Sequence, residues 1–347
     1  MSLGEKDSLP AITVIVVNLN RMNLLRECLI SLRRQSLPPA EVIVVDNAST
    51  DASRDMVARE FPGVRLLALD SNQGFCAANN LAIAIAQGDF IALLNNDATA
   101  EPGWLAALLA ATGANPRVGM VASKILVAGR PGIIDKVGHG IYLDGQNRGR
   151  GSGEPDHGQY DHLSDVLWPD GCAALYRRDM LSQIGGFEEA FFAYADDAEL
   201  GLRARSAGWI TRFAPQAIVH HHRGATLGKY NPARIRLIER NRLWLAVIHF
   251  PLWLLLLNPF FYALRLLSGA LAALSGQGEA SQVSGLRAKI SLAGTLLAAD
   301  WEALRGLAPI WRKRRAWRAR RSFSDLEVFR LLWQHRLSLS ELSRNLA

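Results

Sequence analysis

Short β-branched runs alternate with helical patterns over the first third of the chain, and this alternation limits the possible folds more than any other feature. The runs occupy residues 12–17, 42–45, 64–69 and 90–94, and the segments between them repeat apolar residues at helical spacing. Strands separated by helices are typical of a largely parallel sheet that helices cover on its faces. The sequence therefore predicts an α/β fold that begins near residue 11.

Polar side chains follow three of these strands at the point where each strand ends. They are Asn18 and Asn20, then Asp46 and Asn47, then Asn95, Asn96 and Asp97. Because the carboxyl ends of parallel strands meet at one edge, where such sheets bind ligands, we expect a binding site there. Asp46 suits a nucleobase or ribose, although an Asx-rich capping turn explains residues 46–51 as well. Asp97 suits Mg2+ or Mn2+ against a diphosphate, whereas a strand-end turn explains the amides equally well.

Two more polar clusters lie in the second half of the chain. Asp196, Asp197 and Glu199 begin a helix expected over residues 196–206. Acidic residues in a first helical turn are stabilised by the helix dipole, but adjacent carboxylates also raise a pKa toward that of a general base. Residues 220–222 are three consecutive histidines at the end of a strand, where neighbours point to opposite faces, so one ring is expected to face a metal rather than three.

Further strands are expected at 172–176, 209–213 and 217–219, after a segment rich in Gly, Asp and His. That segment, residues 128–165, is interpreted as a long loop or a small excursion over the sheet, and loops of this length are usually functional or disordered. Its glycine-rich part, 149–153, follows no expected strand and opens no helix, which disfavours a phosphate-binding loop.

The charge of the chain is unevenly distributed. Residues 1–230 hold 21 basic and 25 acidic side chains, a net charge of −4, whereas residues 231–347 hold 18 and 7, a net charge of +11. A nucleic-acid enzyme usually places positive charge around its active cleft, so this distribution indicates an appendage that meets an anionic surface, with membrane lipid as the first candidate.

An apolar stretch opens this basic part. Residues 243–264 carry no formal charge and are long enough to cross a bilayer, but Pro251 and the Asn258-Pro259 pair interrupt them. Basic residues flank both sides, so a single crossing would place one set on the wrong side. A hairpin or in-plane amphipathic helices satisfy both constraints, and a buried hairpin packed on the catalytic domain is the alternative.

The tail from residue 311 to 321 interleaves Trp311 and Trp317 with seven basic residues. Such a cluster suits an anionic leaflet, where each Lys or Arg contributes about 1 kcal/mol. Nucleic acid is the rival partner, but no recognised nucleic-acid fold accompanies the tail, and we expect no nucleic-acid binding. The three cysteines lack metal or disulfide spacing, which fits a reducing cytosol, and residues 1–10 form a polar tail without an export signal.

Seven segments of the chain, in this order, resemble the family 2 glycosyltransferases, inverting enzymes of the GT-A fold, and in particular their bacterial rhamnosyltransferase-like branch. The segments are residues 13–21, 44–51, 72–75 with Asn80, 94–97, 196–200, 221–226 and 240–242. Two positions differ from the family pattern: Asn95 stands where the first Asp of a D-x-D motif is usual, and Asp196 where a Glu is usual. The expected organisation is a tail at 1–10, a GT-A domain at 11–242 and a helical, membrane-interface region at 243–347.

The resemblance implies a role for each matched residue. Asp197 is the base that deprotonates the acceptor hydroxyl, with Asp196 beside it, and Asp97 and His221 hold Mg2+ or Mn2+. Gly171 and Cys172 lie near the acceptor. The residues implied to contact the donor nucleotide are Asn18, Asn20, Asp46, Asn47, Gly74, Asn80, Asn95 and Asn96.

The expected reaction is a single, inverting displacement on a nucleotide-diphosphate sugar, with dTDP-rhamnose as the first choice. The expected acceptor is a polyprenyl-diphosphate-linked glycan of cell-surface polysaccharide, met at the cytoplasmic face of a bacterial inner membrane by a peripheral or re-entrant region. A sugar nucleotidyltransferase is the rival enzyme, but residues 18–21 lack the glycine of its phosphate loop. A non-catalytic membrane scaffold is the other alternative, and the presence of Asp46, Asp97 and Asp197 disfavours it.

Overall fold

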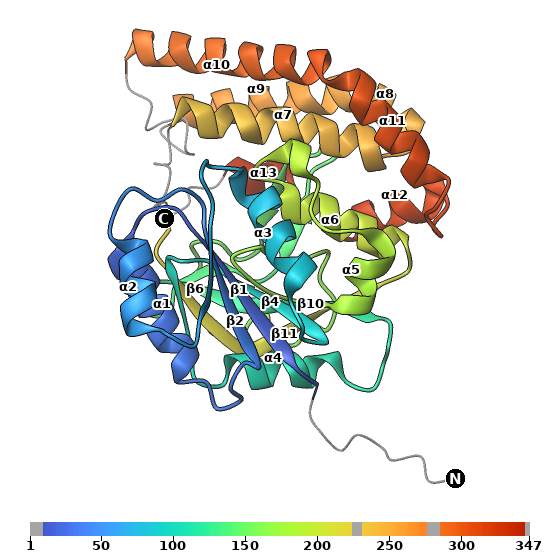
Figure 1. Cartoon of the computed structure of the whole chain (residues 1–347). Helices are drawn as coiled ribbons and strands as arrows, with labels where there is room; N and C mark the ends of the chain where they lie inside the picture. The colour runs from blue at the N-terminus through green and yellow to red at the C-terminus, as the bar shows by residue number, and fades with distance from the viewer. Residues whose placement is uncertain (1–9, 224–230, 276–284, 344–347) are drawn as a thin grey trace, which may run out of the picture.

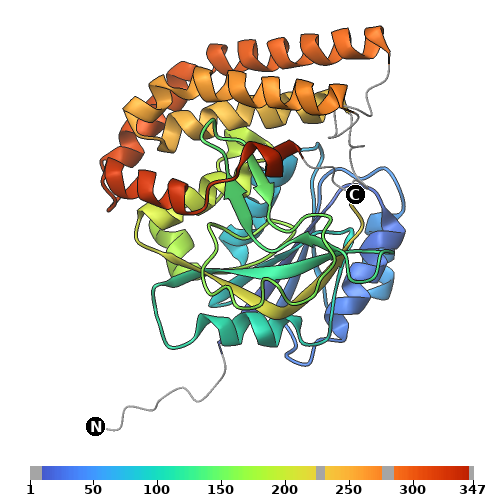
Figure 2. The ribbon, with the colours of Figure 1, turned by 180° about the vertical axis from the view of Figure 1, so that it is seen from behind.

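The fold comes from a computed structural model that describes residues 10–223, 231–275 and 285–343. The positions expected in the tail at 1–9, and Gly224 to Thr226 of one matched segment, lie outside the described residues. Figures 1 and 2 show a sheet with helices on both faces, and a layer of C-terminal helices over the end of that body.

The first third of the chain folds as the alternation predicts. The elements are β1 (Ile12–Asn18), α1 (Met22–Arg33), β2 (Glu41–Asp46), α2 (Ser53–Glu60), β3 (Arg65–Ala68), α3 (Gly74–Ile85) and β4 (Phe90–Leu94). The strands β3, β2, β1 and β4 are neighbours in that order, and every pair is parallel. This confirms the predicted parallel sheet for residues 12–94, the part of the chain from which it was predicted.

The middle of the chain adds the other half of the sheet. Its elements are β5 (Ala98–Ala100), α4 (Trp104–Thr112), β6 (Val118–Val127), β10 (Ala173–Arg177), α5 (Arg178–Ile184), the 3-10 helix η1 (Glu189–Phe191), α6 (Asp196–Ser206) and β11 (Ile210–His221). The two strands expected at 209–213 and 217–219 are one strand, β11, whose pairing with β6 shifts register between Ala214 and Ile218.

Strand order continues from β4 through β10, β6 and β11 to β5. β10 is antiparallel to both of its neighbours, β6 and β11 are parallel, and β5 is antiparallel to β11. The antiparallel strand β10 therefore separates the parallel N-terminal half from the second half. It brings Gly171 and Cys172, just before its start, to the end of β4, where Asn95 N–H donates to the carbonyl of Cys172 at 2.8 Å.

The segment expected as a loop or excursion contains three short strands among its turns. β7 (Ile134–Lys136) is antiparallel to β6, and β8 (His139–Ile141) pairs with β9 (Asn147–Gly149) in a small separate sheet. The glycine-rich part at 149–153 does follow a strand, contrary to expectation, because Gly149 ends β9; turns and no helix come directly after it.

Apolar side chains pack on both faces of the large sheet. On one face Val14 and Val44 join α1, α2 and α4 in a core that includes Leu25, Met56 and Trp104. On the other face Ile15, Ile43 and Val45 join α3, α5 and α6. This second core runs on without a break into the C-terminal helices, through Trp244, Leu245, Ile310 and Leu332.

The last third of the chain is helical. It consists of α7 (Pro232–His249), α8 (Leu252–Leu256), α9 (Asn258–Leu274), α10 (Leu286–Arg305), α11 (Leu307–Arg318), α12 (Asp325–Gln334) and α13 (Leu339–Ser343). In Figures 1 and 2 α7, α9 and α10 run side by side as a layer over α3 and α6, and α11 and α12 descend along one side. α7 runs continuously through residue 242, so the change of composition at Leu243 is not the end of an element.

The apolar stretch at 243–264 is broken where its prolines stand. Pro251 separates α7 from α8, and Pro259 lies in the first turn of α9. Within the described ranges, none of the helices has both the length and the apolar character that a membrane crossing requires.

The basic tail is only partly exposed. Arg314 is buried, and its guanidinium donates to the carbonyls of Val247 and Phe250 at 2.6 and 2.7 Å, where α7 ends. Trp317 is also buried and donates to Ser206 Oγ at 3.1 Å. These two members of the cluster expected at a leaflet therefore join the tail to the protein and are not exposed to one.

Candidate active site

The polar residues at the strand ends meet as expected at one edge of the sheet. Asn18 Nδ2 donates to Asp46 Oδ2 at 3.2 Å, and Asn96 Nδ2 donates to Asn18 Oδ1 at 2.7 Å. All three side chains are buried. Because β1 lies between β2 and β4, its last residue links the other two strand ends into one network.

Asp46 is bonded within its own turn. Its side chain is 1% exposed, Arg54 Nε donates to Oδ1 at 2.6 Å, and Ser49 N–H donates to the same oxygen at 3.0 Å. These contacts agree with the capping-turn interpretation of residues 46–51. A contact between Asp46 and the donor nucleoside stays a prediction.

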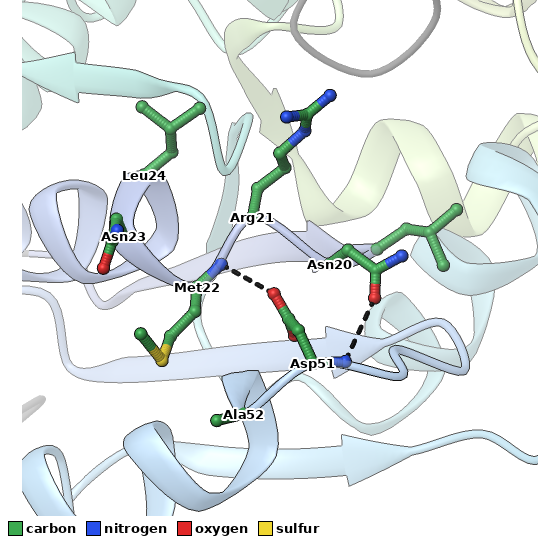
Figure 3. A pocket seen from close by; sticks show the side chains of 8 residues that line it. Asn20, Arg21, Met22, Asn23, Leu24, Asp51 and Ala52 are labelled. Carbon is green, nitrogen blue, oxygen red and sulfur yellow. Dashed lines mark hydrogen bonds between the residues drawn. The ribbon is translucent and has the colours of Figure 1, made fainter.

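A pocket of about 740 Å³ lies where β1 leads into α1. Asn20 forms one wall, and its Oδ1 accepts from Asp51 N–H at 3.3 Å, while Asp51 Oδ2 accepts from Met22 N–H at 3.0 Å (Figure 3). Asn20 and Arg21 both have positive φ, which turns the chain sharply here. The pocket is lined by Leu19, Asn20, Arg21, Met22, Asn23, Leu24, Asp51 and Ala52.

Asn47, Gly74 and Asn80 join loops around this edge. Asn47 Oδ1 accepts from Gln73 N–H at 2.8 Å and its Nδ2 donates to the carbonyl of Gly74 at 3.2 Å. Gly74 has a φ of +82°, and a side chain there would collide with Phe192. Asn80 pairs with the backbone of Phe187, accepting from N–H at 2.8 Å and donating to the carbonyl at 2.9 Å. These three residues shape the loops, and their predicted contact with the donor is not tested by these bonds.

Asp97 and His221 face each other across two paired strands. Asp97 ends the turn after β4, β5 pairs antiparallel with the end of β11, and His221 Nε2 lies 3.4 Å from Asp97 Oδ1. His221 is buried, whereas His222 is exposed, in agreement with the expectation that one ring of the three turns inward. His220 pairs instead with Glu101, at 3.1 Å.

A third residue, Asp135 on β7, completes this group. Its Oδ2 lies 2.7 Å from His221 Nδ1, and its side chain is 0% exposed. Burial lowers the pKa of His221, but the carboxylates of Asp135 and Asp97 outweigh burial and raise it to about 9. Sequence reasoning did not select Asp135, because the segment around it shows no regular pattern.

The group has a place for a divalent cation. Asp97 is 5% exposed, and among the described residues no donor forms a hydrogen bond with its Oδ1. A buried carboxylate oxygen without a hydrogen bond is rare and calls for a partner such as an ion. Asp97 and His221 thus fit a metal site by the chemistry of their atoms, with an oxygen and a nitrogen turned toward each other.

The carboxylate pair at the start of α6 has little contact with solvent, and the Asp197 side chain is 12% exposed. Asp196 is 6% exposed, and burial together with Asp197 raises its pKa well above the ordinary value. Burial likewise raises the pKa of Asp197, although His139 opposes the change. Gly171 N–H donates to Asp197 Oδ2 at 3.3 Å, so the two residues expected near base and acceptor are neighbours. Cys172 is buried, with 3% of its surface exposed, and its side chain belongs to the core on the α1, α2 and α4 face.

Three residues that the sequence did not single out surround Asp197. Asp170 Oδ2 lies 2.6 Å from Lys136 Nζ and 2.8 Å from His139 Nε2. The same His139 nitrogen lies 3.6 Å from Asp197 Oδ2, and the His139 ring stacks on Trp168. The only sequence feature that pointed to Lys136 and His139 was the length of the segment 128–165, which is typical of a functional loop.

His139, Asp170 and Asp197 are close enough to hold a metal ion themselves. Lys136 argues against that use, because its ammonium already neutralises Asp170, and a dication there would be repelled. Asp170 Oδ1 also accepts from Cys172 N–H at 2.8 Å. We therefore favour Asp97 and His221 as the metal site and the Asp197 cluster as the proton-transfer site.

The loop that leads into α6 has unusual backbone geometry. Phe192, Tyr194 and Ala195 have φ values of 65°, 69° and 55°, which L-residues rarely adopt. Asn241 on α7 is fully buried, and its Nδ2 lies within 2.9 Å of the carbonyl oxygens of Phe191, Ala193 and Tyr194. Arg240 adds bonds to the carbonyls of Ala190 and Phe191 at 3.2 and 3.1 Å. A helix of the C-terminal layer thus holds the loop before the carboxylate pair.

Comparison with known proteins adds an independent view of this chain. The family model named glycosyl transferase family 2 matches residues 13–185. The N-acetylglucosaminyl-diphospho-decaprenol L-rhamnosyltransferase of Mycobacterium tuberculosis is 30% identical over 226 residues, which are 59% of this chain and 74% of that protein. The O-antigen biosynthesis protein RfbC of Myxococcus xanthus is 28% identical over 255 residues, 71% of this chain and 19% of that protein.

Among solved structures, the similarity extends to the fold. A crystal structure of GalNAc-T7 with UDP, GalNAc and Mn2+ superposes with a TM-score of 0.56, at 14% identity, over 70% of this chain and 48% of that chain. At this identity the match concerns the arrangement of the α/β core alone.

Proposed function

Because this chain belongs to glycosyl transferase family 2 and has the GT-A fold, we propose that it moves a sugar from a nucleotide-diphosphate donor to a hydroxyl of a lipid-linked glycan. The observation that carries the proposal is the pair of acidic groups on one edge of the sheet. Asp97 Oδ1, which forms no hydrogen bond within the described part of the chain, faces His221 Nε2 at 3.4 Å. The carboxylates of Asp196 and Asp197 lie near the strand end from which Asp97 follows. Asp97 and His221 suit the binding of a diphosphate with its cation, and Asp196 and Asp197 suit the transfer of a proton.

The proposed chemistry is a single displacement. Asp197 accepts the proton of the acceptor hydroxyl as that oxygen attacks the anomeric carbon, and the nucleoside diphosphate leaves from the opposite side, so the anomeric configuration inverts. The raised pKa of Asp197 supports this role, because a stronger base accepts the proton more readily. Asp97 and His221 would hold Mg2+ or Mn2+, which when bound supplies positive charge against the departing diphosphate.

The donor and acceptor follow from the relatives and not from the site. The Mycobacterium tuberculosis relative is named for rhamnose transfer to an N-acetylglucosaminyl-diphospho-decaprenol, which supports dTDP-rhamnose as the first donor to test and a polyprenyl-diphosphate-linked glycan as the acceptor. The pocket between the start of α1 and Asp51 is the proposed place for part of the donor nucleotide, because it lies at the carboxyl ends of β1 and β2.

A membrane surface is the proposed partner of the C-terminal layer. Leu256, Leu274 and Leu297 are 74%, 81% and 70% exposed, and most of the other large exposed apolar side chains of the described residues also lie beyond residue 250. Exposed large apolar side chains gathered in one part of a protein are typical of an interaction site. We propose that α8, α9 and α10 lie on the cytoplasmic face of a bacterial inner membrane as a peripheral layer that meets the lipid-linked acceptor.

The function is tested by screening the purified chain against a panel of nucleotide sugars with a lipid-linked glycan acceptor, with and without Mn2+ or Mg2+. Release of nucleoside diphosphate that requires acceptor supports a glycosyltransferase, whereas release of pyrophosphate from a sugar phosphate and a nucleoside triphosphate would identify a nucleotidyltransferase. Asp197→Asn should lower the turnover number by about 100-fold or more with donor binding unchanged. Asp179→Asn, an exposed first-turn acid of α5, is the matched control.

A further inference from the structure

Asp135 is a fully buried carboxylate in the least regular part of the sheet domain. It lies on the three-residue strand β7, and its side chain is 0% exposed. Burying a carboxylate costs free energy unless charged or hydrogen-bonding partners surround it. Two nitrogen groups supply such partners here, the His221 ring and the Arg223 guanidinium, and the arginine always carries a positive charge.

The contacts of Asp135 show which nitrogen of the His221 ring faces it. Its Oδ2 lies 2.7 Å from His221 Nδ1, and Arg223 Nε lies 2.9 Å from Oδ1. An ionised carboxylate only accepts hydrogen bonds, so the ring nitrogen that meets it carries the proton. His221 Nδ1 therefore donates to Asp135, and Nε2 is the ring nitrogen that faces Asp97 Oδ1, at 3.4 Å.

Strand pairing fixes this geometry. β7 is antiparallel to β6, β6 is parallel to β11, and β11 ends at His221, so Asp135 and His221 are set by one continuous sheet. A histidine that binds a metal almost always donates its other ring N–H to a carboxylate or carbonyl, which fixes the tautomer and the ring orientation. The group of Asp135, His221 and Asp97 has that arrangement.

We propose that Asp135 is a positioning residue that holds the His221 ring so that Nε2, together with Asp97, binds the divalent cation of the transfer reaction. The inference rests on the metal site proposed above, with His221 and Asp97 as its protein ligands. Asp135 itself does not touch the cation: its effect on metal affinity passes through His221 alone.

The test measures Mn2+ binding to the full chain in the absence of substrates, by isothermal titration calorimetry and by the electron paramagnetic resonance of free Mn2+. Asp135→Asn keeps the size of the side chain but weakens its hydrogen bond to His221, and we expect Mn2+ affinity to fall by about 10- to 100-fold. Asp165→Asn is the matched control, because Asp165 lies in the same segment and pairs with Arg205 and His335 but not with His221.

A second comparison shows whether Asp135 affects Mn2+ affinity through His221 or independently of it. We expect His221→Gln to weaken Mn2+ binding, and Asp135→Asn to cause no further loss in the His221→Gln background. An affinity of Asp135→Asn within two-fold of the wild-type value, or losses that multiply in the double variant, would overturn the inference. Normal Mn2+ affinity of His221→Gln, or no Mn2+ binding by the wild-type chain, would overturn the metal site itself, which is a different result.

The wild-type chain provides a measurement that does not depend on how well a variant folds. Nitrogen-15 NMR of labelled histidine, with His221 assigned by its loss in His221→Gln, reports which ring nitrogen carries the proton. We expect Nδ1 to remain protonated and the resonance of Nε2 to shift when diamagnetic Cd2+ is added. A shift at Nδ1 in its place contradicts the proposed role of Asp135.

Discussion

At the scale of single residues, the carboxylates of this site differ in what surrounds them. Asp46 is held by Arg54, Asp170 is held by Lys136, and Asp97 faces His221 with an oxygen that forms no hydrogen bond in the described ranges. Asp196 and Asp197 have no Lys or Arg ion pair among the described residues, and their pKa values are raised. The chemistry of each acid is thus set by its neighbours, which come from other elements of the chain.

The raised pKa of Asp197 predicts the pH dependence of transfer. A general base works only when deprotonated, so kcat/KM should fall as pH falls through the pKa of Asp197 in the free enzyme. Because burial raises this pKa, the loss should begin at a higher pH than for an ordinary aspartate. The measurement is kcat/KM against pH at saturating Mn2+, and a rate that stays constant down to the ordinary Asp pKa would remove Asp197 from the role.

Glu199, two residues further along α6, predicts a different pH effect, on stability. Burial raises the pKa of Glu199, but Arg203 and His249 outweigh it and lower the pKa to about 2. Since the folded pKa is below the unfolded one, the stabilisation is present above the ordinary Glu pKa and is lost as pH falls toward 2. It amounts to on the order of 3 kcal/mol in the free energy of unfolding.

Urea unfolding between pH 3 and 7 measures this contribution. Glu199→Gln should be less stable than wild type at pH 7, and the difference should shrink as pH falls. Glu27→Gln, an exposed position on α1, is the control that should follow the wild-type curve. A constant difference between Glu199→Gln and wild type over the whole range would show that the ionised form of Glu199 adds no stability.

At the scale of elements, the sequence predicted the regular parts well and the irregular parts poorly. β1 to β4 and their helices repeat apolar residues at fixed spacing, so their order and their polar ends were visible. Asp135, Lys136 and His139 lie on strands of three residues, too short to show a period. Their functional position depends on pairing with β6 and packing on Trp168, which are contacts between distant parts of the chain.

Asn241 of α7 holds the loop before α6, and we therefore predict that substituting Asn241 lowers the rate of transfer. Its three contacts are to the carbonyls of a loop with strained φ values, and that loop leads directly to Asp196 and Asp197. Without Asn241 the loop is free to relax, and a displacement of about 1 Å costs a rate factor of about 100. Asn241→Ala should therefore lower kcat strongly and leave the KM for the donor nearly unchanged.

Asn258→Ala is the matched control for this prediction. Asn258 is also buried in the C-terminal layer and donates to a loop carbonyl, that of Asp144 at 2.8 Å, but no bond joins it to the loop before α6. Equal losses of kcat in the two variants, or a loss explained by a lower melting temperature, would mean that Asn241 acts on general stability rather than on the position of Asp197.

At the scale of the whole molecule, the C-terminal helices belong to the same core as the transferase body. Trp244 and Leu245 of α7 and Ile310 of α11 pack in the core of the α3 and α6 face, and Arg240 pairs with Glu302 of α10 at 2.7 Å. The different net charges of residues 1–230 and 231–347 therefore belong to two surfaces of one folded body. Removing residues 243–347 would expose this core. Membrane binding measured on such a truncated chain would therefore not report on the surface of the intact protein.

Point substitutions on the outside of the layer test membrane binding without touching the core. On α9 Phe260, Leu267, Leu271 and Leu274 are exposed, and on α10 Ile290, Leu297, Trp301 and Leu304 are exposed. Both sets have spacings of seven, four and three residues, which places each set along one side of its helix. Exposed basic residues accompany them: Arg287, Lys289, Arg305, Arg312 and Arg315. Exposed apolar stripes with basic residues on the same or the next helix suit the interface of an anionic bilayer.

The prediction is that the full chain floats with vesicles that contain phosphatidylglycerol, and less with vesicles of phosphatidylcholine alone, because basic residues contribute about 1 kcal/mol each at an anionic surface. Changing Leu267, Leu271, Leu297 and Trp301 to Glu should abolish flotation, since each change places a charge in the exposed apolar stripe that is expected to enter the bilayer interface. Leu81→Glu, at an exposed apolar position of α3 outside the layer, should float as wild type does. If the four-fold variant keeps its melting temperature and still floats, the layer is not the membrane-binding surface.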